Sequence, residues 1–258
     1  MNKVAVVVGG GQTLGEFLSK GLGNAKYDVA VLDLNGENAA NVAKEIETEF
    51  GVKAIGYKVD ATNEVEVINT FNNIKNDFGK IDLMIYSAGV AKSKKITEFE
   101  LKDFEITMAV NTTGYFLCSR ETAKVMVDTQ TPGSIIQINS KSGKVGSKHN
   151  SAYSASKFAG VGLTQSLALD LAEHNIRVNS LMLGNLLKSP MFQSLIPQYA
   201  KKLGIPVEEV EQLYIDKVPL KRGCDYSDVL NSILFYGSEN AAYMTGQSIN
   251  ITGGQVMF

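Results

Sequence analysis

The stretch KVAVVVGGGQTLG, residues 3–15, decides the fold of this chain of 258 residues. After Lys3 it begins with a continuous apolar, β-branched run, which is typical of a strand buried on both faces of a parallel sheet. The glycine-rich loop 9–15 follows, and we expect a helix over 16–25 and a second strand, within 28–34, that ends in Asp33. Such a turn lets backbone N–H groups approach a pyrophosphate closely. The stretch therefore predicts a βαβ unit that binds a dinucleotide.

Asp33 stands near the end of the second predicted strand. A carboxylate at this place accepts hydrogen bonds from the adenosine ribose, and its negative charge repels a 2′-phosphate. The position of Asp33 therefore favours NAD over NADP as the cofactor.

Strands and helices alternate along the rest of the chain. We expect helices over 36–50, 63–78 and 227–237, two helical segments within 97–128, and a long helix after residue 150. Further strands are expected to end at Asp60, at 87–89 and near Asn139, and others to cover 176–183 and 246–254. Right-handed crossovers then give an α/β fold of the Rossmann type, a doubly wound parallel sheet of about seven strands with helices on both faces.

A long segment after the sixth predicted strand, about 186–223, departs from the short loops of such a fold. Four prolines are expected to divide it, and two amphipathic segments lie between them. Segments of this length beside a ligand-binding face are often lids. The candidate apolar contacts of this lid are Met191, Phe192, Leu195 and Tyr199. Because no repeat or linker interrupts the chain, we predict one domain, 1–258, with a lid-like helical insertion.

The stretch 140–157 indicates chemistry on an alcohol or a carbonyl. Ser140 follows a predicted strand, and Tyr153 and Lys157 form an i, i+4 pair on the next helix. A tyrosine acts as a base only if its anion is stabilised, and a nearby cation typically lowers its pKa by roughly 1 to 3 units. Asn111 lies within an apolar helical stretch. Its amide is either satisfied by backbone groups or holds a water that carries protons from Lys157, and the sequence leaves both open.

Composition excludes several other classes of protein. A net charge of -2 gives no footprint for nucleic acid or an anionic membrane. The two cysteines cannot form a disulfide framework, which favours a reducing cytoplasm. We predict no metal site, because there are only two histidines and no cluster of ligands. The N-terminal apolar run is too short to span a bilayer and is better interpreted as the first strand.

Along its whole length the chain resembles the short-chain dehydrogenase/reductase family. The glycine-rich turn, Asp33, Asp60, the Ser-Ala-Gly at 87–89, Asn111, Ser140 and the Tyr-Ser-Ala-Ser-Lys at 153–157 stand in the family's order. The resemblance implies hydride transfer with NAD, with Tyr153 as the acid/base, Lys157 lowering its pKa and binding the nicotinamide ribose, Ser140 positioning the substrate and Asn111 supporting a proton relay. It also implies a homotetramer, in which the apolar tail 253–258 could dock on a neighbouring subunit.

The resemblance implies a cofactor-binding set that comprises Gly9, Gln12, Thr13, Leu14, Gly15, Asp33, Asp60, Ala61, Ser87, Ala88, Gly89, Tyr153, Lys157, Gly184 and Leu186. Three positions depart from the family pattern. Thr13 replaces a glycine, Tyr86-Ser87 replaces a pair of asparagines, and Leu183 replaces a proline.

Four stretches, 137–151, 184–195, 214–226 and 252–258, resemble family members that act on phosphorylated hexitols or ketoses. Cations are expected to gather near the ligand face and attract such an anion: Lys92, Lys94, Lys95, Lys141, Lys144, Lys148, His149, Lys188 and Arg222. Our hypothesis is that Lys141 or Lys188 contacts the phosphate, so the substrate-binding set is Ser140, Lys141, Tyr153 and Lys188. The alternatives are a related reductase acting on an uncharged polyol, a sugar or a β-ketoacyl thioester, and a sensor that binds NAD without turnover.

Overall fold

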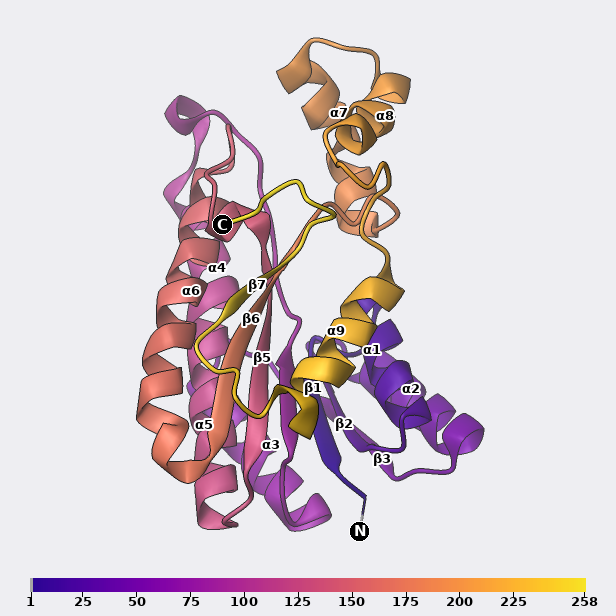
Figure 1. Cartoon of the computed structure of the whole chain (residues 1–258), viewed down its shortest axis with the longest axis vertical. Coiled ribbons are helices and arrows are strands. Elements are labelled where there is room, and N and C mark those ends of the chain that lie inside the picture. The colour runs from indigo at the N-terminus through magenta and orange to yellow at the C-terminus, as the bar shows by residue number, and fades with distance from the viewer. Residues whose placement is uncertain (1) are drawn as a thin grey trace.

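A seven-stranded sheet forms the centre of the computed structural model, which describes residues 2–258 (Figure 1). All strand pairs are parallel, and the order is β3-β2-β1-β4-β5-β6-β7. The strands are β1 (Val4–Val8), β2 (Asp28–Asp33), β3 (Ala54–Lys58), β4 (Leu83–Tyr86), β5 (Gly133–Ser140), β6 (Ile176–Leu183) and β7 (Ser248–Ile251). This confirms the predicted doubly wound sheet. Its order reverses between β1 and β4, where sheets of this kind open a ligand-binding crevice at the strands' carboxyl ends.

Helices cover both faces of the sheet (Figure 1). On one face lie α1 (Thr13–Asn24), α2 (Gly36–Phe50) and α9 (Tyr226–Tyr236), and on the other lie α3 (Glu64–Phe78), α4 (Leu101–Met108), α5 (Gly114–Asp128) and α6 (Ser151–Leu171). Two more, α7 (Pro190–Leu203) and α8 (Val210–Asp216), stand beyond the carboxyl ends of the strands. The lid-like segment therefore lies above the predicted ligand-binding edge.

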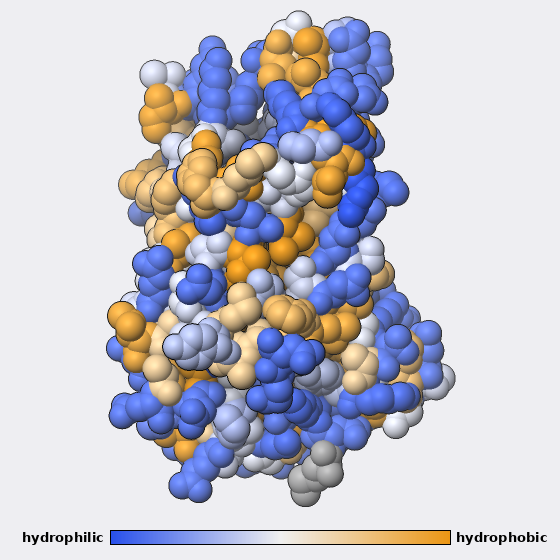
Figure 2. Space-filling view, viewed as in Figure 1, coloured by the Kyte–Doolittle hydropathy of each residue, from blue (hydrophilic) through white to orange (hydrophobic). Residues whose placement is uncertain are grey.

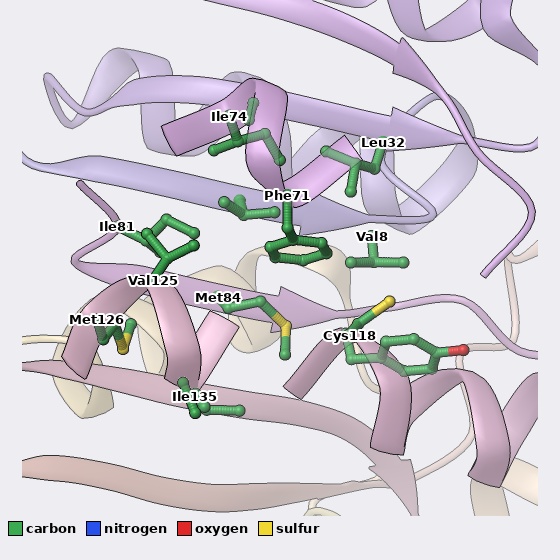
Figure 3. Close-up of a cluster of buried hydrophobic side chains, with 14 of the residues drawn as sticks. Val8, Leu32, Phe71, Ile74, Ile81, Met84, Cys118, Val125, Met126 and Ile135 are labelled. Carbon is green, nitrogen blue, oxygen red and sulfur yellow. The ribbon is translucent and has the colours of Figure 1, made fainter. Parts of the chain in front are cut away.

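The core consists of two apolar clusters, one on each face of the sheet. Val4, Val6 and Val8 belong to one cluster, and Ala5 and Val7 belong to the other. Because successive side chains of a strand point to opposite faces, this alternation explains why β1 is apolar at every position. Figure 3 shows the first cluster, in which side chains of α3 and α5 meet the sheet.

The helical region around Asn111 is not regular. Between α4 and α5 the backbone forms a π-helix over Ala109–Thr113. The hydroxyl of Tyr86, at the end of β4, donates a hydrogen bond of 2.5 Å to the carbonyl of Val110 in this turn. A phenol thus ties the strand end to the helix where the family pattern has an amide. The two predicted helical segments are confirmed, and the π-helix is the join between them.

One expectation about the lid-like segment is wrong. Pro197 does not divide it, since α7 runs through this residue, whereas Pro190 occupies the first turn of the helix. A proline within a helix removes one backbone hydrogen bond. Packing opposes this loss, because the ring of Phe192 lies 5.6 Å from that of Tyr199 and 5.2 Å from that of Tyr214, between ring centroids. Aromatic contacts thus hold α7 against α8.

Candidate active site

A cavity of about 440 Å³ opens at the carboxyl ends of the strands. Residues of the glycine-rich loop, of the ends of β2, β4, β5 and β6, of α6 and of the lid-like segment line it. Every residue of the predicted cofactor-binding set is among them, as are the four candidate lid contacts. The structure therefore brings the predicted cofactor and lid residues together around one space.

The glycine-rich loop can accept a pyrophosphate because it is packed too closely for side chains. A Cβ on Gly15 would overlap the carbonyl oxygen of Gly9, and one on Gly9, whose φ is +74°, would lie 2.8 Å from the backbone nitrogen of Ala88. At the start of α1, the side chain of Gln12 caps none of the first N–H groups. These donors, at the positive end of the helix dipole, suit the phosphates of a dinucleotide.

Thr13 shows how this chain accommodates the missing glycine. Its φ is +51°, in the left-handed region that a β-branched residue rarely adopts. Such a conformation costs on the order of 1 kcal/mol or more. The loop thus keeps the backbone path of a glycine although a side chain is present.

Asp33 is 5% exposed, and backbone donors fix its carboxylate. The N–H of Gly11 donates to Oδ2 at 2.9 Å, and that of Asn35 donates to Oδ1 at 3.0 Å. Each oxygen can accept a further hydrogen bond. Because Asp33 also lines the cavity, it is placed to receive ribose hydroxyls.

Ser140, Tyr153 and Lys157 line the same cavity. Ser140 ends β5, and Tyr153 and Lys157 come from the first turns of α6. The Nζ of Lys157 donates a hydrogen bond to the carbonyl of Ile138 at 3.1 Å and lies 5.5 Å from the centroid of the Tyr153 ring. The N–H of Ser142 donates to the Oγ of Ser140 at 3.2 Å, which leaves the hydroxyl proton of Ser140 free to point elsewhere.

The expected lowering of the Tyr153 pKa by Lys157 is not found. Burial raises the pKa of Tyr153, and a hydrogen bond with the Ser140 side chain acts in the opposite direction. Burial also lowers the pKa of Lys157 to about 8, because its ammonium group has lost water and faces a neutral carbonyl. In this structure desolvation therefore dominates both groups.

Asn111 is 1% exposed and does not itself line the cavity. Its Oδ1 accepts a hydrogen bond from the N–H of Val90 at 2.9 Å, and its Nδ2 donates to the carbonyl of Val90 and to the Oγ of Ser156, both at 3.0 Å. Backbone groups and Ser156 thus satisfy the hydrogen bonds of the Asn111 amide. This agrees with the first of the two alternatives that the sequence left open, in which backbone groups satisfy the amide. Asn111 ties the π-helix to the loop after β4 and to α6, one residue before Lys157.

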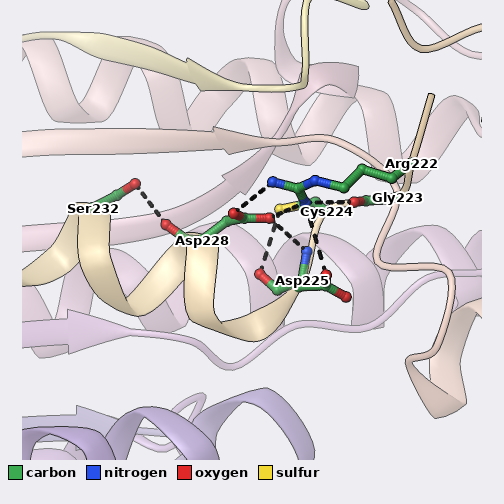
Figure 4. Close-up of polar contacts among 6 residues, drawn as sticks. All are labelled: Arg222, Gly223, Cys224, Asp225, Asp228 and Ser232. Atoms are coloured by element: carbon green, nitrogen blue, oxygen red, sulfur yellow. Dashed lines mark hydrogen bonds and ion pairs between the residues drawn. The ribbon is translucent and has the colours of Figure 1, made fainter. Parts of the chain in front are cut away.

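Most of the cations expected at the ligand face lie elsewhere. Lys141 lines the cavity, whereas Lys188 is exposed and does not. Lys94 pairs with Asp103 at 2.9 Å and Glu100 at 3.1 Å. Arg222 pairs with Asp228, which also takes part in the capping box of α9 (Figure 4). The charges of Lys94 and Arg222 thus form structural ion pairs with neighbouring carboxylates. Closeness in sequence to the site did not predict which cations line the cavity.

Sequence reasoning missed lining residues that come from distant parts of the chain, among them Asn150, Asn185, Tyr214 and Tyr226. It also missed Gln255, whose Oε1 accepts a hydrogen bond of 2.5 Å from the Nζ of Lys141. The C-terminal tail therefore folds back toward the site of its own chain. The signal available was the unusual Gly-Gly-Gln before an apolar end.

Within residues 2–258, no helix is long and apolar enough to cross a membrane. The same part of the chain contains no group of three or more histidine, cysteine, aspartate or glutamate side chains that could hold a metal ion.

Residues 3–200 match the family model described as short chain dehydrogenase. The chain belongs to the short-chain dehydrogenase/reductase family, whose members bind a nicotinamide cofactor, and the predicted resemblance is confirmed. Sorbitol-6-phosphate 2-dehydrogenase of Escherichia coli (strain K12) is 64% identical over 259 residues, with 100% of each chain covered.

Solved structures agree with this assignment. A crystal structure of sorbitol-6-phosphate 2-dehydrogenase from Erwinia amylovora has a TM-score of 0.97 and 66% identity, covering 98% of this chain and 100% of the other. A structure of NAD⁺-bound xylitol dehydrogenase has a TM-score of 0.93 and 31% identity, covering 98% of both chains.

Proposed function

We propose that this protein catalyses the reversible, NAD-dependent oxidation of D-sorbitol 6-phosphate at C2, which gives D-fructose 6-phosphate in sorbitol catabolism. The observation that carries the proposal is the single cavity shared by the dinucleotide loop, the Ser140, Tyr153 and Lys157 side chains, and the half-buried Lys141. The full-length identity of 64% to a relative with this activity supports it.

In the proposed mechanism, Ser140 and Tyr153 hold the reacting oxygen. The nicotinamide ring of NAD, when bound, accepts the hydride from C2. The phenol oxygen of Tyr153 takes the proton of the C2 hydroxyl, so that one hydride and one proton leave the substrate. Ser140 donates its remaining hydrogen bond to the same oxygen and orients it. In the reverse direction the protonated phenol returns the proton to the carbonyl oxygen.

Lys157 and Asn111 support this proton transfer. Lys157 lies beside the Tyr153 ring, where its positive charge stabilises the phenolate once the site is filled, and its ammonium also binds the nicotinamide ribose. Asn111 keeps the loop after β4 against α6 through Val90 and Ser156. In this way it supports a proton path that leads away from Lys157.

The direct test is to mix the purified protein with NAD⁺ and D-sorbitol 6-phosphate and to follow absorbance at the NADH band. We expect growth of this band, and far less with unphosphorylated sorbitol or with NADP⁺. Equal turnover of unphosphorylated sorbitol would instead favour a dehydrogenase of uncharged polyols. A sensor would be favoured if the protein bound NAD⁺ but oxidised none of these alcohols and reduced no β-ketoacyl thioester with NADH.

The proposed preference for NAD depends on the charge of Asp33. The variant Asp33→Asn keeps an acceptor for one backbone N–H but removes the repulsion of a 2′-phosphate. We expect the ratio of kcat/KM for NAD⁺ to that for NADP⁺ to fall by at least about tenfold. Asp28→Asn, at the opposite end of β2, is the matched control and should leave the ratio unchanged. An unaltered ratio in Asp33→Asn would show that other groups set the preference.

We also propose that the chain acts as one domain, with 186–223 as its lid, in a cytoplasmic homotetramer. Both cysteines are free thiols, as in a reducing compartment. Met257 and Phe258, at the end of the tail, are 79% and 76% exposed. The face seen in Figure 2 shows hydrophobic residues gathered near its middle. Burial of such groups between subunits would stabilise an assembly, and light scattering after size-exclusion chromatography would measure its mass.

A further inference from the structure

Lys141 is a half-buried cation without a counter-charge. Its Nζ donates to the neutral amide oxygen of Gln255, and within residues 2–258 it takes part in no ion pair. Burial lowers the pKa of Lys141 to about 8, and the positive charge of Lys217 acts in the same direction. Removing a charge from water without a partner of opposite sign is costly. An anion in the cavity would relieve this cost.

Lys217 lies on the lid-like segment next to the cavity, although its side chain is exposed and does not itself line the cavity. It directly follows α8, and its Nζ lies 5.3 Å from the ring centroid of Tyr214, a lining residue of the cavity. Among the described residues Lys217 also forms no ion pair, in contrast to Lys94 and Arg222. Two cations from different segments, neither in an ion pair among the described residues, thus lie close enough for the charge of Lys217 to act on Lys141.

The C-terminal turn holds these segments together. Gly253 and Gly254 have φ values of +61° and +89°, which side chains rarely adopt. A Cβ on Gly253 would lie 2.7 Å from Val218, and one on Gly254 would lie 2.9 Å from Pro219. The residues just after Lys217 therefore pack against the residues just before Gln255. This packing keeps Lys217 beside the pair formed by Lys141 and Gln255.

We propose that Lys141 and Lys217 together bind the phosphate of the substrate, and that Gln255 is a positioning residue that holds Lys141 for this contact. The inference deepens the proposed function and rests on it. Lys141 directly follows Ser140, so a hexitol whose C2 hydroxyl meets Ser140 can extend its phosphate toward the lysine pair. Charge-assisted hydrogen bonds from two lysines would distinguish a phosphorylated hexitol from its uncharged counterpart.

The variant Lys217→Ala tests the contact. We expect the KM for D-sorbitol 6-phosphate to rise by about 10- to 100-fold, with kcat changed less than about threefold, because the phosphate lies away from the reacting carbon. The matched control is Lys201→Ala, which removes an exposed lysine of the same segment that neither lines the cavity nor belongs to the predicted substrate-binding set. Its KM should change by less than about twofold. A KM in Lys217→Ala equal to that of the control would overturn the proposal.

Gln255 variants test the positioning role. Gln255→Glu places a carboxylate against Lys141 and next to the incoming phosphate, so we expect a larger rise in KM than for Gln255→Ala, whereas Gln255→Asn should recover part of the loss. If Gln255 only stabilised the fold, Gln255→Ala and Gln255→Glu would lower the melting temperature, and the KM of Gln255→Glu would not exceed that of Gln255→Ala.

Binding of inorganic phosphate, followed by calorimetry, separates this inference from the proposed function. Loss of phosphate binding in Lys217→Ala would support the anion site even if the parent protein failed to oxidise sorbitol 6-phosphate. Oxidation by the parent protein with unchanged phosphate binding and KM in Lys217→Ala would overturn the anion site alone.

Discussion

Replacing Tyr153 by phenylalanine is expected to lower kcat for the oxidation of sorbitol 6-phosphate by about 10²- to 10⁴-fold. The change removes one oxygen atom and leaves the ring that packs beside Lys157. NAD⁺ should therefore bind with an affinity within about threefold of the parent protein. The measurement is initial rates at the NADH band together with a titration of NAD⁺ by calorimetry.

The matched control is Tyr57→Phe, which removes a hydroxyl that hydrogen-bonds to Asp77 at 2.7 Å, on β3 and away from the cavity. It should turn over normally. Near-normal turnover in Tyr153→Phe would mean that another group takes the proton.

The sign of the pH dependence follows from burial, which raises the pKa of Tyr153. Oxidation needs the phenolate and should accelerate as the pH rises into the alkaline range, whereas reduction of fructose 6-phosphate needs the phenol and should slow.

Replacing Gly15 by alanine is expected to damage both stability and cofactor binding. The new Cβ would overlap the carbonyl oxygen of Gly9, so α1 or the loop must move. Overpacking of this kind typically costs about 1–3 kcal/mol in the free energy of unfolding. The displaced loop should also lower the affinity for NAD⁺ by at least about tenfold. Chemical denaturation and an NAD⁺ titration measure the two effects.

Gly162→Ala is the control for this prediction. Gly162 lies within α6, and no atom of the chain comes within 4 Å of the place of its missing Cβ. An alanine there should stabilise the protein by about 0.4–1 kcal/mol, because the unfolded chain loses conformational freedom. Equal behaviour of the two variants would refute close packing as the reason for Gly15.

The sequence predicted the sheet well because its signals are local. The run in β1 is apolar at every position since both faces of the sheet are covered, and α2 has the predicted bounds. Pro197 led to a wrong prediction of a helix break. The hydrogen bond that a proline removes is a local loss, whereas the aromatic contacts that outweigh it join α7 to α8. Side-chain packing between segments is not visible in the order of residues.

The candidate site was predictable where residues follow strand ends. Asp33 and Ser140 were found in this way, because parallel strands deliver their carboxyl ends to one edge. The cations that line the cavity were not predictable, because a lysine or arginine in the sequence does not show which group it pairs with in the fold. Lys94 and Arg222 resembled candidates yet pair with carboxylates, and Lys141 meets Gln255 across 114 residues of sequence.

The π-helix at Ala109–Thr113 also makes the length of this segment adjustable. A π-turn holds about one residue more than an α-helical turn, so removal of one residue here would convert it to α-helix while α4 and α5 keep the same faces toward the sheet. Tyr115 and Cys118 would stay buried, but Asn111 would be displaced from Val90 and Ser156. A one-residue deletion should therefore leave the chain folded and lower its activity, whereas the same deletion within α5 would rotate the buried residues after it by about 100° and disrupt the core.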